Sequence, residues 1–323
     1  MSLPRRALTL VAAALVLTAC GSSPSTAPAA GKGNTAPNGT KVNLTADQKR
    51  VTTAKVDAIA ALVPEEIRNR GTLRVVESIG SVPPLDFYAD DNKTIIGTEP
   101  DIAYLIGDVL GLKVELNPVS WENIFVGLDS GKYDVGLSNI TVTEARKEKY
   151  DFATYRLDII GFEAKKGSAW KVTGPKDVAG RTISVASGTN QEKLLVSWNE
   201  ENIKNGLKPV DIKYFQNSSD YYLALGSGRI DAYLGPNPVA AFHAAQTGET
   251  EIIGTYSGAG AEVLGKIGAT TKKDNGLVKA LHEALGSIIK DGTYGQVLKR
   301  WGLENEAVPA AELNPPGLPK ANK

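Results

Sequence analysis

The chain has 323 residues, with 36 basic side chains against 36 acidic ones and a single cysteine. A net charge of zero without a basic stripe argues against a nucleic-acid-binding protein, and the length is enough for two ordinary domains. One cysteine allows no intramolecular disulfide, so stability has to come from burial of a core.

The N-terminus is typical of a targeting segment. Arg5 and Arg6 precede an apolar run at 7–18 that is shorter than a typical transmembrane helix. The run ends in Leu-Thr-Ala-Cys at 17–20, which resembles a bacterial lipobox. We therefore expect a lipoprotein signal peptide at 1–19 and lipid on Cys20, anchoring the chain to the outer face of the cytoplasmic membrane. An ordinary secreted protein with an unmodified cysteine is the alternative.

Composition then changes along the chain. Residues 20–45 consist mainly of Ser, Thr, Pro, Ala, Gly and Asn, and we expect them to form a disordered tether. Residues 46–70 carry apolar side chains at helical spacing, divided by Pro64, and predict an N-terminal helical segment. Residues 306–323, rich in Pro, Ala and Asn, predict a tail.

A repeated motif organises the middle of the chain. The pattern Leu-x-Ser-Gly-basic-x-Asp-small occurs at 128–135 and again at 225–232. A Leu that ends a helix, a Gly that can adopt positive φ and a short apolar strand form one βα-type unit. Two unrelated turns would be the alternative, but the neighbouring elements also correspond, so the motif indicates two similar lobes.

Each lobe has the predicted order strand, helix, strand, helix, strand, which is the half-unit of a doubly wound α/β fold. The first lobe has strands at 73–76, 113–117 and 133–137 and helices at 101–110 and 121–128. The second has strands at 182–186, 211–215 and 230–234 and helices at 190–202 and 219–225. A helix at 238–247, an extended segment at 262–270 and helices at 274–290 and 294–301 have no counterpart.

Hydroxyl and amide side chains follow the strand at 133–137, at the carboxyl edge where open α/β sheets bind ligands. Ser138, Asn139 and Thr141 lie there, and Arg146 follows on a short helical turn from which it can point back over the edge. A guanidinium at this place suits bidentate pairing with a carboxylate. A surface Arg paired with a neighbouring acid is the alternative.

In the second lobe, residues 187–192 join a strand to a helix. Thr189 and Glu192 form the capping box Thr-x-x-Glu. The free N–H groups of the first helical turn, around Asn190, form an anion site, and Gly188 lets a ligand approach the backbone. A plain helix start is the alternative.

Together these segments resemble the family 3 extracellular solute-binding proteins, the polar amino acid receptors of bacterial ABC importers, over about residues 70–303. The matching stretches are 97–102, 141–146, 187–190, 228–232 and 291–302. The resemblance implies that Thr141 and Arg146 hold an α-carboxylate together with backbone N–H groups near Thr189 and Asn190. It also implies that Trp121 occupies the aromatic position of the pocket.

The resemblance further implies an α/β fold of the type II periplasmic-binding-protein kind, with two βαβαβ lobes joined by crossover strands near 159–165 and 262–269. The first lobe would comprise 71–161 and the return segment 265–305, and the second 162–264. Hinge closure over the ligand would follow, for delivery to an ABC permease in the membrane. We expect a monomer without cofactor or metal.

Pro236 departs from the family pattern, because amino acid-binding relatives carry an Asp there for the α-ammonium. Proline offers neither charge nor a side-chain hydrogen bond, and a buried ammonium without a counter-charge costs on the order of several kcal/mol. Either another acid supplies the charge, by position Glu77, Asp86 or Asp158, or the ligand has no α-ammonium. Asn237, next in sequence, would offer a polar contact.

The remaining candidates carry less chemistry. His243 and His282 have no Cys or acid at metal spacing and are expected to be surface or packing histidines, and Tyr221 and Tyr222 are expected to cover the core. The sequence therefore predicts a non-catalytic receptor for a small polar solute that bears a carboxylate. Rival functions are an enzyme of the dehydratase type on the same scaffold, with Glu77 or Asp158 as the catalytic acid or base, and a sensor that docks a signalling partner.

Overall fold

The computed structural model describes residues 34–80 and 82–320, which belong to one compact unit. The expected signal peptide and Cys20 lie outside the described residues. Within the described ranges, none of the helices combines the length and the apolar character that a bilayer crossing requires.

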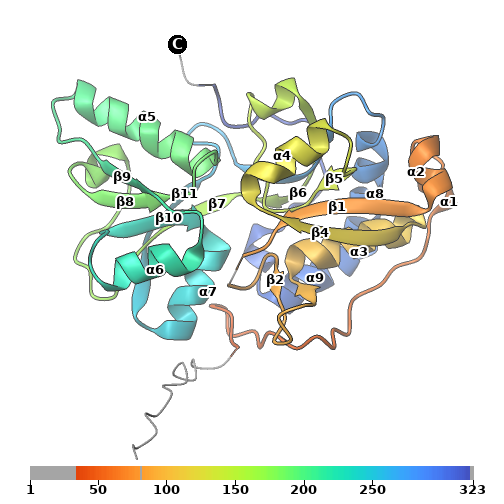
Figure 1. Cartoon of the computed structure of the whole chain (residues 1–323), viewed down its shortest axis with the longest axis horizontal. Coiled ribbons are helices and arrows are strands. Elements are labelled where there is room, and N and C mark those ends of the chain that lie inside the picture. The colour runs from red at the N-terminus through yellow and green to blue at the C-terminus, as the bar shows by residue number, and fades with distance from the viewer. Residues whose placement is uncertain (1–33, 81, 321–323) are drawn as a thin grey trace, which may run out of the picture. The chain divides into compact units, whose positions relative to one another are not determined.

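Two five-stranded mixed sheets form the framework of this unit (Figure 1). In the first, β1 pairs in parallel with β4 and β5, and β12 pairs antiparallel with β5 and β6. Its spatial order is β4 (Lys113–Val119), β1 (Thr72–Ser78), β5 (Val135–Gly136), β12 (Lys266–Lys272) and β6 (Tyr150–Leu157). A small hairpin of β2 (Phe87–Tyr88) and β3 (Ile95–Ile96) lies beside it.

The second sheet places β8 in parallel between β10 and β9, while β7 pairs antiparallel with β10 and β11. Its spatial order is β11 (Thr250–Ser257), β7 (Ile159–Lys165), β10 (Ala232–Pro236), β8 (Thr182–Val185) and β9 (Asp211–Tyr214). We call each sheet with the helices packed on it a lobe.

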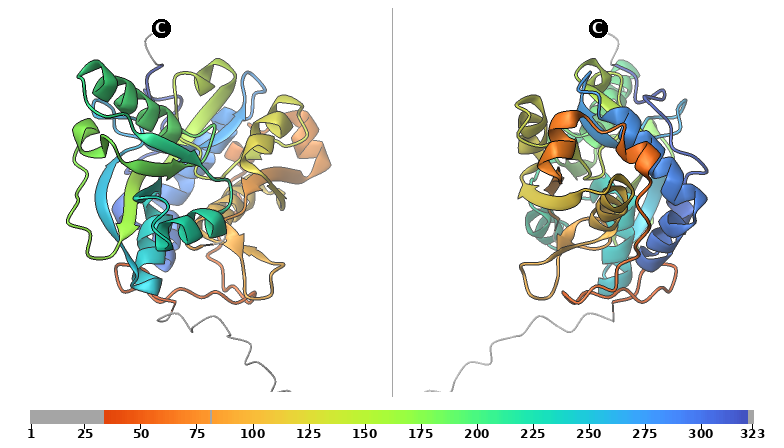
Figure 2. Two further views of the ribbon diagram at one scale, coloured as in Figure 1. Left: turned by 60° about the vertical axis from the view of Figure 1, so that its left-hand side comes forward. Right: turned by 90° about the vertical axis from the view of Figure 1, so that its right-hand side faces the viewer.

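Helices cover both faces of each sheet (Figures 1 and 2). On the first sheet, α3 (Thr98–Leu110), α8 (Val278–Lys290) and α9 (Thr293–Trp301) pack on one face and α4 (Trp121–Asp129) on the other. On the second, α5 (Asn190–Lys204) faces α6 (Ser218–Gly226) and α7 (Asn237–Thr247) across the sheet. The short elements are α1 (Asp57–Ala60), α2 (Glu65–Arg70), η1 (Arg146–Glu148), η2 (Pro175–Val178) and η3 (Glu304–Glu306).

The side chains of the central strands alternate between the two faces of each sheet, which explains why helices pack on both faces. On β1, Val75 belongs to the cluster under α3 and α8, whereas the next residue, Val76, belongs to the cluster under α4. On β10, Leu234 packs with α5, and Tyr233 packs with α6. Successive side chains of a strand point to opposite faces, so each strand contributes to two cores.

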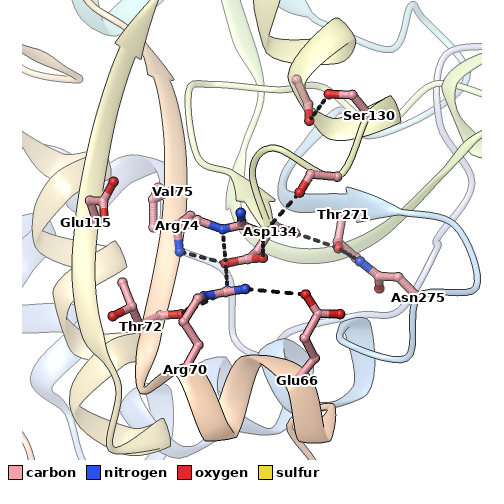
Figure 3. Close-up of polar contacts among 12 residues, drawn as sticks. Glu66, Arg70, Thr72, Arg74, Val75, Glu115, Ser130, Asp134, Thr271 and Asn275 are labelled. Atoms are coloured by element: carbon pink, nitrogen blue, oxygen red, sulfur yellow. Dashed lines mark hydrogen bonds and ion pairs between the residues drawn. The ribbon is translucent and has the colours of Figure 1, made fainter.

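The Asp of the repeated motif precedes a strand in each lobe and bonds it in the same way to the neighbouring strand, β1 in the first sheet and β8 in the second. The Asp134 carboxylate accepts a hydrogen bond from the backbone N–H of Arg74 at 2.8 Å, and its own N–H donates to Arg74 O at 2.9 Å. Asp231 makes the same two bonds with Thr182, at 2.8 and 2.7 Å. Figure 3 shows that the Arg70 and Arg74 guanidinium groups also converge on Asp134. The repeated motif therefore has a structural role, because its Asp joins neighbouring strands in both lobes.

Two crossings connect the sheets. Asp158 alone separates β6 from β7, and residues 258–265 lead from β11 to β12. The Asp158 N–H donates to Gly265 O at 2.8 Å, and its carbonyl accepts from the Gly258 N–H at 2.9 Å, so one residue holds both crossings. Both crossings precede the expected positions, because residues from Ile159 onward already pair with β11 and residues from Lys266 onward already pair with β6.

The N-terminal segment differs from the sequence prediction. From residue 34 onward the expected tether packs on the first lobe and buries Ala36 and Val42. Residues 46–56 contain no helix, and helix is confined to α1 and α2. The Val56 N–H donates to Val109 O at 3.0 Å, and the Thr53 hydroxyl donates to Asp291 at 2.7 Å. These bonds attach the stretch to neighbouring helices, although it forms no helix of its own.

The C-terminal segment also differs. Residues 306–320, expected to be a tail, run along β6, the outer strand of the first sheet. The Thr154 N–H donates to Glu312 O and the Asn314 N–H to Phe152 O, both at 3.0 Å. We call residues 306–320 the C-terminal strap. It pairs the open edge of the sheet by backbone hydrogen bonds, which leave no periodic signal in the sequence.

Candidate functional site

A cavity of about 220 Å³ opens between the two lobes, where strands of both sheets end. Segments that follow β1 and β5 line it from the first lobe, and segments that follow β8, β9 and β10 line it from the second. This is the ligand-binding edge of open α/β sheets. Its lining includes Ser78, Asp86, Trp121, Ser138, Asn139, Thr189, Asn190, Phe215, Tyr221 and Pro236. The volume is below the roughly 300–1,000 Å³ of drug-sized sites and suits a small polar solute.

Three predicted site residues line the cavity from the first lobe: Trp121, Ser138 and Asn139. The Ser138 hydroxyl donates to Asp86 at 2.6 Å and accepts from the Ser78 N–H at 2.8 Å. Asn139 adopts a φ of 52°, and its Oδ1 accepts from Arg156. Both polar side chains after β5 are therefore held in fixed orientations at the wall of the cavity.

Two predicted residues, Thr189 and Asn190, line it from the second lobe. Thr189 caps α5, because its hydroxyl accepts from the Glu192 N–H at 3.2 Å. Asn190 Nδ2 donates to Asp158 Oδ2 and to Gly258 O, both at 3.0 Å. The N-terminus of α5, with its partial positive charge, thus faces the cavity while the Asn190 side chain contacts both crossings.

Arg146 lies beside the lining and joins the lobes. Its Nη1 donates to Thr141 O at 2.9 Å in the first lobe, and its Nη2 donates to Gly188 O at 3.3 Å in the second. The guanidinium lies 5.3 Å from the ring centroid of Trp121 and 5.1 Å from that of Phe125. Only 8% of the residue is exposed, so the surface interpretation does not apply. A guanidinium has five N–H donors, and these two bonds leave others for an anion.

Burial lowers the pKa of Arg146 to about 10, although the nearby Asp158 charge opposes this shift. The side chain therefore remains cationic at neutral pH. A buried guanidinium that contacts an aromatic ring and two carbonyl groups has strong attraction for a carboxylate, because both partners are shielded from water.

Thr141 and Asp158 meet where the lobes cross, and neither lines the cavity. The Thr141 hydroxyl donates to Asp158 Oδ2 at 2.7 Å, and both residues are buried. Burial raises the pKa of Asp158, and the hydrogen bond from Thr141 opposes the shift. The Thr141 hydroxyl, predicted to hold an anion, instead holds the crossing acid, while its carbonyl orients Arg146.

An acidic cluster adjoins the cavity on the first-lobe side. It consists of Glu77, Asp86, Glu99 and Glu306, with Arg156 as its buried cation. Arg156 donates to Glu99 at 2.9 Å and also pairs with Glu306. Glu77 is fully buried, and neither of its oxygens has a hydrogen-bond partner within residues 34–80 and 82–320. The cluster thus contains four carboxyl groups and one guanidinium, which pairs with two of them.

Asp86 is the member of this cluster that reaches the cavity. Burial raises its pKa well above the usual range, and the Glu99 charge raises it further. Burial likewise raises the pKa of Glu77, with added effects of Asp86 and Glu99. A cation that approaches Asp86 would relieve both shifts, since an opposite charge favours the ionised carboxylate. Sequence reasoning had named Asp86 only as one of three possible acids.

The end of β10 carries the departure from the family pattern. Pro236 lines the cavity, as does Asn139 after the corresponding strand of the first lobe. Asn237 does not line it; its Oδ1 lies against Gly161, where an added Cβ would come within 2.9 Å. The Asn237 side chain, predicted to offer a polar contact to the ligand, is therefore directed at β7.

Aromatic residues of the second lobe also line the cavity, and sequence reasoning missed them. Tyr221 stacks on Tyr233 with 3.8 Å between ring centroids and 6° between planes, and both contribute to the wall with Phe215. Tyr221 had been assigned to the core. Phe215 ends the strand predicted at 211–215, and its place at a carboxyl edge was a signal that could have identified it.

The two histidines have packing roles. His243 Nδ1 lies 2.6 Å from a carboxylate oxygen of the buried Glu163, and its ring stacks on Tyr222 at 3.5 Å between centroids. His282 contacts Ala311 O at 3.3 Å. In the part of the chain that the structure describes, no group of three or more His, Cys, Asp or Glu side chains is arranged to hold a metal ion.

Comparison with known proteins gives one family. The sequence model of bacterial extracellular solute-binding proteins, family 3, matches residues 75–304. The L-cystine-binding protein TcyJ of Escherichia coli is 31% identical over 237 residues, which are 73% of this chain and 84% of TcyJ.

Solved structures agree with this assignment. An ancestral arginine-binding protein bound to arginine is 31% identical, with a TM-score of 0.60 over 72% of this chain and 98% of that chain. The ancestral amino acid-binding protein AncCDT-1, a precursor of cyclohexadienyl dehydratase, is 28% identical, with a TM-score of 0.60 over 75% of this chain and 98% of that one.

Proposed function

The chain belongs to the bacterial extracellular solute-binding proteins of family 3 and is a solute-binding receptor; from this premise, we propose that it binds an amino acid or a close derivative between its lobes. The observation that carries the proposal is the position of Arg146. Its buried guanidinium touches the backbone of both lobes next to the cavity. A carboxylate bound there would contact both lobes at once and favour the closed arrangement.

Arg146 and the N-terminus of α5 would hold the carboxylate. Arg146 supplies N–H donors from the first lobe, and the helix start at Asn190 supplies backbone N–H groups and a partial positive charge from the second. Trp121, Phe215 and Tyr221 would cover the apolar part of the ligand. Micromolar affinity, about −8 kcal/mol, is the expected order for a receptor of this kind.

Asp86 would take the cationic group that Pro236 cannot bind. Its carboxyl lines the cavity, is oriented by Ser138 and belongs to a cluster with more carboxyl groups than cations. The relatives named for L-cystine and L-arginine bind ligands that carry an ammonium group. An ammonium or guanidinium at Asp86 would supply the missing positive charge, so a ligand with an α-ammonium remains compatible with proline at position 236.

We expect Arg146→Ala and Asp86→Asn to affect opposite ends of the ligand. Titration calorimetry with an amino acid, its α-amide and its deaminated acid would measure both ends. Arg146→Ala should abolish most of the preference for the amino acid over its α-amide. Asp86→Asn should abolish most of the preference for the amino acid over its deaminated acid. Each loss should be about 2–5 kcal/mol, the cost of removing one partner of a buried charge pair.

Tyr88→Phe is a control, because this exposed side chain lies outside the cavity lining. It should leave all three affinities unchanged. If Arg146→Ala kept the full preference for the carboxylate, the role of Arg146 would be refuted.

A separate experiment tests whether the receptor turns over its ligand. Glu77 and Asp158, the acids named for an enzymatic alternative, are buried and do not line the cavity. A general acid or base has to reach the bound molecule, so we propose binding without catalysis. NMR of the ligand after prolonged incubation should return it unchanged; a stoichiometric excess of product would contradict the proposal.

We further propose that the receptor is lipid-anchored through Cys20 at the outer face of the cytoplasmic membrane and delivers its ligand to an ABC permease. The lipobox-like sequence at 17–20 supports the anchor. Closure of the lobes over the ligand would present both lobes together to the permease.

A further inference from the structure

We propose that the C-terminal strap is part of the binding machinery: it positions the loop 141–147 and thereby the Arg146 guanidinium that receives the ligand carboxylate. The inference rests on the proposed role of Arg146. The family match ends at residue 304, so the strap at 306–320 lies outside the segment that the family shares.

The strap pairs directly with the Arg146 loop. The Leu318 N–H donates to Val142 O at 3.1 Å, and the Glu144 N–H donates to Leu318 O at 3.0 Å. The Gly317 N–H donates to the Glu144 carboxylate at 2.9 Å. Three hydrogen bonds thus fix Val142 and Glu144, the residues on either side of Thr143.

Thr143 transmits this placement to Arg146. Its hydroxyl accepts from the Arg146 N–H at 3.1 Å, and the residue is almost fully buried. On the other side of Arg146, Lys147 Nζ donates to Pro315 O at 3.1 Å and to Glu144 at 2.9 Å. The strap therefore contacts the chain on both sides of the guanidinium-bearing residue.

The opposite edge of the loop rests on the start of β12. The Val142 N–H donates to Lys266 O at 2.9 Å, and Thr141 forms an antiparallel bridge with Ile267. Lys266 also pairs with Glu312 of the strap. The loop is held between β12 and the strap, and the strap is bonded to both.

The strap has anchors of its own on β6. The Asn314 N–H donates to Phe152 O at 3.0 Å, its Oδ1 accepts from the Phe152 N–H at 2.8 Å, and its Nδ2 donates to Asp151 at 3.0 Å. The buried Glu306 pairs with Arg156 at the other end. The strap is therefore fixed to the sheet independently of the loop it supports.

Gly317 is the point at which the strap can be displaced from the loop. An added Cβ would lie 2.3 Å from Val142 O, a backbone atom that cannot turn aside. Gly317→Ala should push the strap and the loop apart. A recognition site tolerates displacements of only about 0.5 Å, so the contribution of Arg146 to binding should fall.

The test compares Gly317→Ala with Gly107→Ala, a matched change in α3 whose Cβ would meet the Val114 side chain at 2.4 Å, in the first lobe away from the strap. Calorimetry on the full-length chain would use L-arginine, L-lysine, L-glutamine and L-cystine, each with its α-amide. Gly317→Ala should reduce the preference for the acid over the amide about tenfold, which is about 1.4 kcal/mol, and Gly107→Ala should leave it unchanged.

Asn314→Ala provides a second strap variant that makes no clash, in case Gly317→Ala does not fold. It should reduce the preference in the same direction. Amide hydrogen exchange of residues 141–147 without ligand gives a readout independent of ligand identity, and it should accelerate in both strap variants only.

The outcomes separate the two proposals. If Arg146→Ala reduces the carboxylate preference while the strap variants leave both the preference and the exchange rates unchanged, the positioning role of the strap is overturned. If Arg146→Ala itself leaves the preference unchanged, or wild type binds none of the four amino acids, the proposed function fails and this inference with it.

Discussion

Among the residues that the structure describes, the buried carboxyl group of Glu77 pairs with no cation. It lies beside Asp86 and Glu99, and the single guanidinium of Arg156 in the cluster is already paired with Glu99 and Glu306. Buried carboxyl groups in this situation hold their proton at pH values where an exposed one would lose it. The residue therefore makes the stability of the protein depend on pH.

We expect Glu77→Gln to stabilise the ligand-free protein at pH 8 and to change its stability little at pH 5. Burial raises the folded-state pKa above the unfolded value of about 4.3. The stability that the protonated Glu77 contributes is complete at pH values below its pKa in the unfolded state. It is lost as the pH rises through its pKa in the folded state. Glutamine does not titrate, so the gain in the free energy of unfolding at pH 8, about 1–3 kcal/mol, should shrink towards pH 5.

Urea denaturation at both pH values measures this difference. Glu122→Gln, an exposed change on α4, is the control and should stay within about 0.5 kcal/mol at each pH. Equal effects of Glu77→Gln at pH 5 and pH 8 would show that the carboxyl is ionised throughout.

At the same scale, the sequence predicted which positions line the cavity better than it predicted which partner each side chain contacts. Ser138, Asn139, Thr189 and Asn190 line the cavity as expected, because strand ends of a repeated α/β unit meet at one edge. The actual partner of Thr141 is Asp158. Such a contact depends on the crossing of two strands, and strand spacing within one lobe carries no information about it.

Helix α7 connects the lobes although it follows a strand of the second sheet. Phe242 is fully buried and belongs to the hydrophobic core of the first lobe, and Val239 packs against the same core. On the other side of the helix, His243 reaches Glu163 of β7 in the second lobe. An element that is shared in this way couples the lobes mechanically.

Phe242→Ala is expected to weaken ligand binding about tenfold in addition to lowering stability by about 3–5 kcal/mol. Removing the ring leaves a cavity at the contact between the lobes, so the closed arrangement loses part of its apolar contact.

Ile253→Ala is the matched control, because Ile253 is buried in the core of the second lobe alone. It should lower stability by a similar amount without changing the dissociation constant, and calorimetry combined with thermal unfolding separates the two effects. Equal dissociation constants for both variants would rule out a coupling role of α7.

The two ends of the described chain show why elements without periodicity escape sequence prediction. The strap and residues 34–56 bury side chains such as Ala36 and Leu318, yet the hydrogen bonds that attach them to the fold run to segments far away in the sequence. Composition rich in Pro, Ala and Asn indicates only that no regular helix or strand forms. Whether such a segment packs depends on the open strand edge and helix ends that the rest of the fold presents.

On the scale of the whole molecule, the order of strands and helices in each lobe could be predicted because it follows from short-range patterns that occur twice. The return of β12 into the first sheet followed from the family resemblance alone, since its pairing with β5 and β6 is long-range. The proposed functions also lie in different parts of the chain. The site lies within the described residues 34–80 and 82–320, and the lipobox-like sequence precedes them in the chain.

Anchoring and binding should therefore be separable. Cys20→Ser removes the thiol that would carry diacylglycerol, and each buried methylene of an acyl chain contributes about 0.8 kcal/mol to membrane attachment. We expect this variant to move from the detergent phase to the aqueous phase in detergent phase partitioning, while its dissociation constant for the ligand stays within about twofold of wild type, since no site residue changes.

Arg146→Ala is the reciprocal control, which should keep the anchor and lose the ligand. Uptake of labelled ligand by cells should fall in both variants, because delivery needs a loaded receptor held close to the permease at high effective concentration. Retention of Cys20→Ser in the detergent phase would show that another segment holds the chain to the membrane.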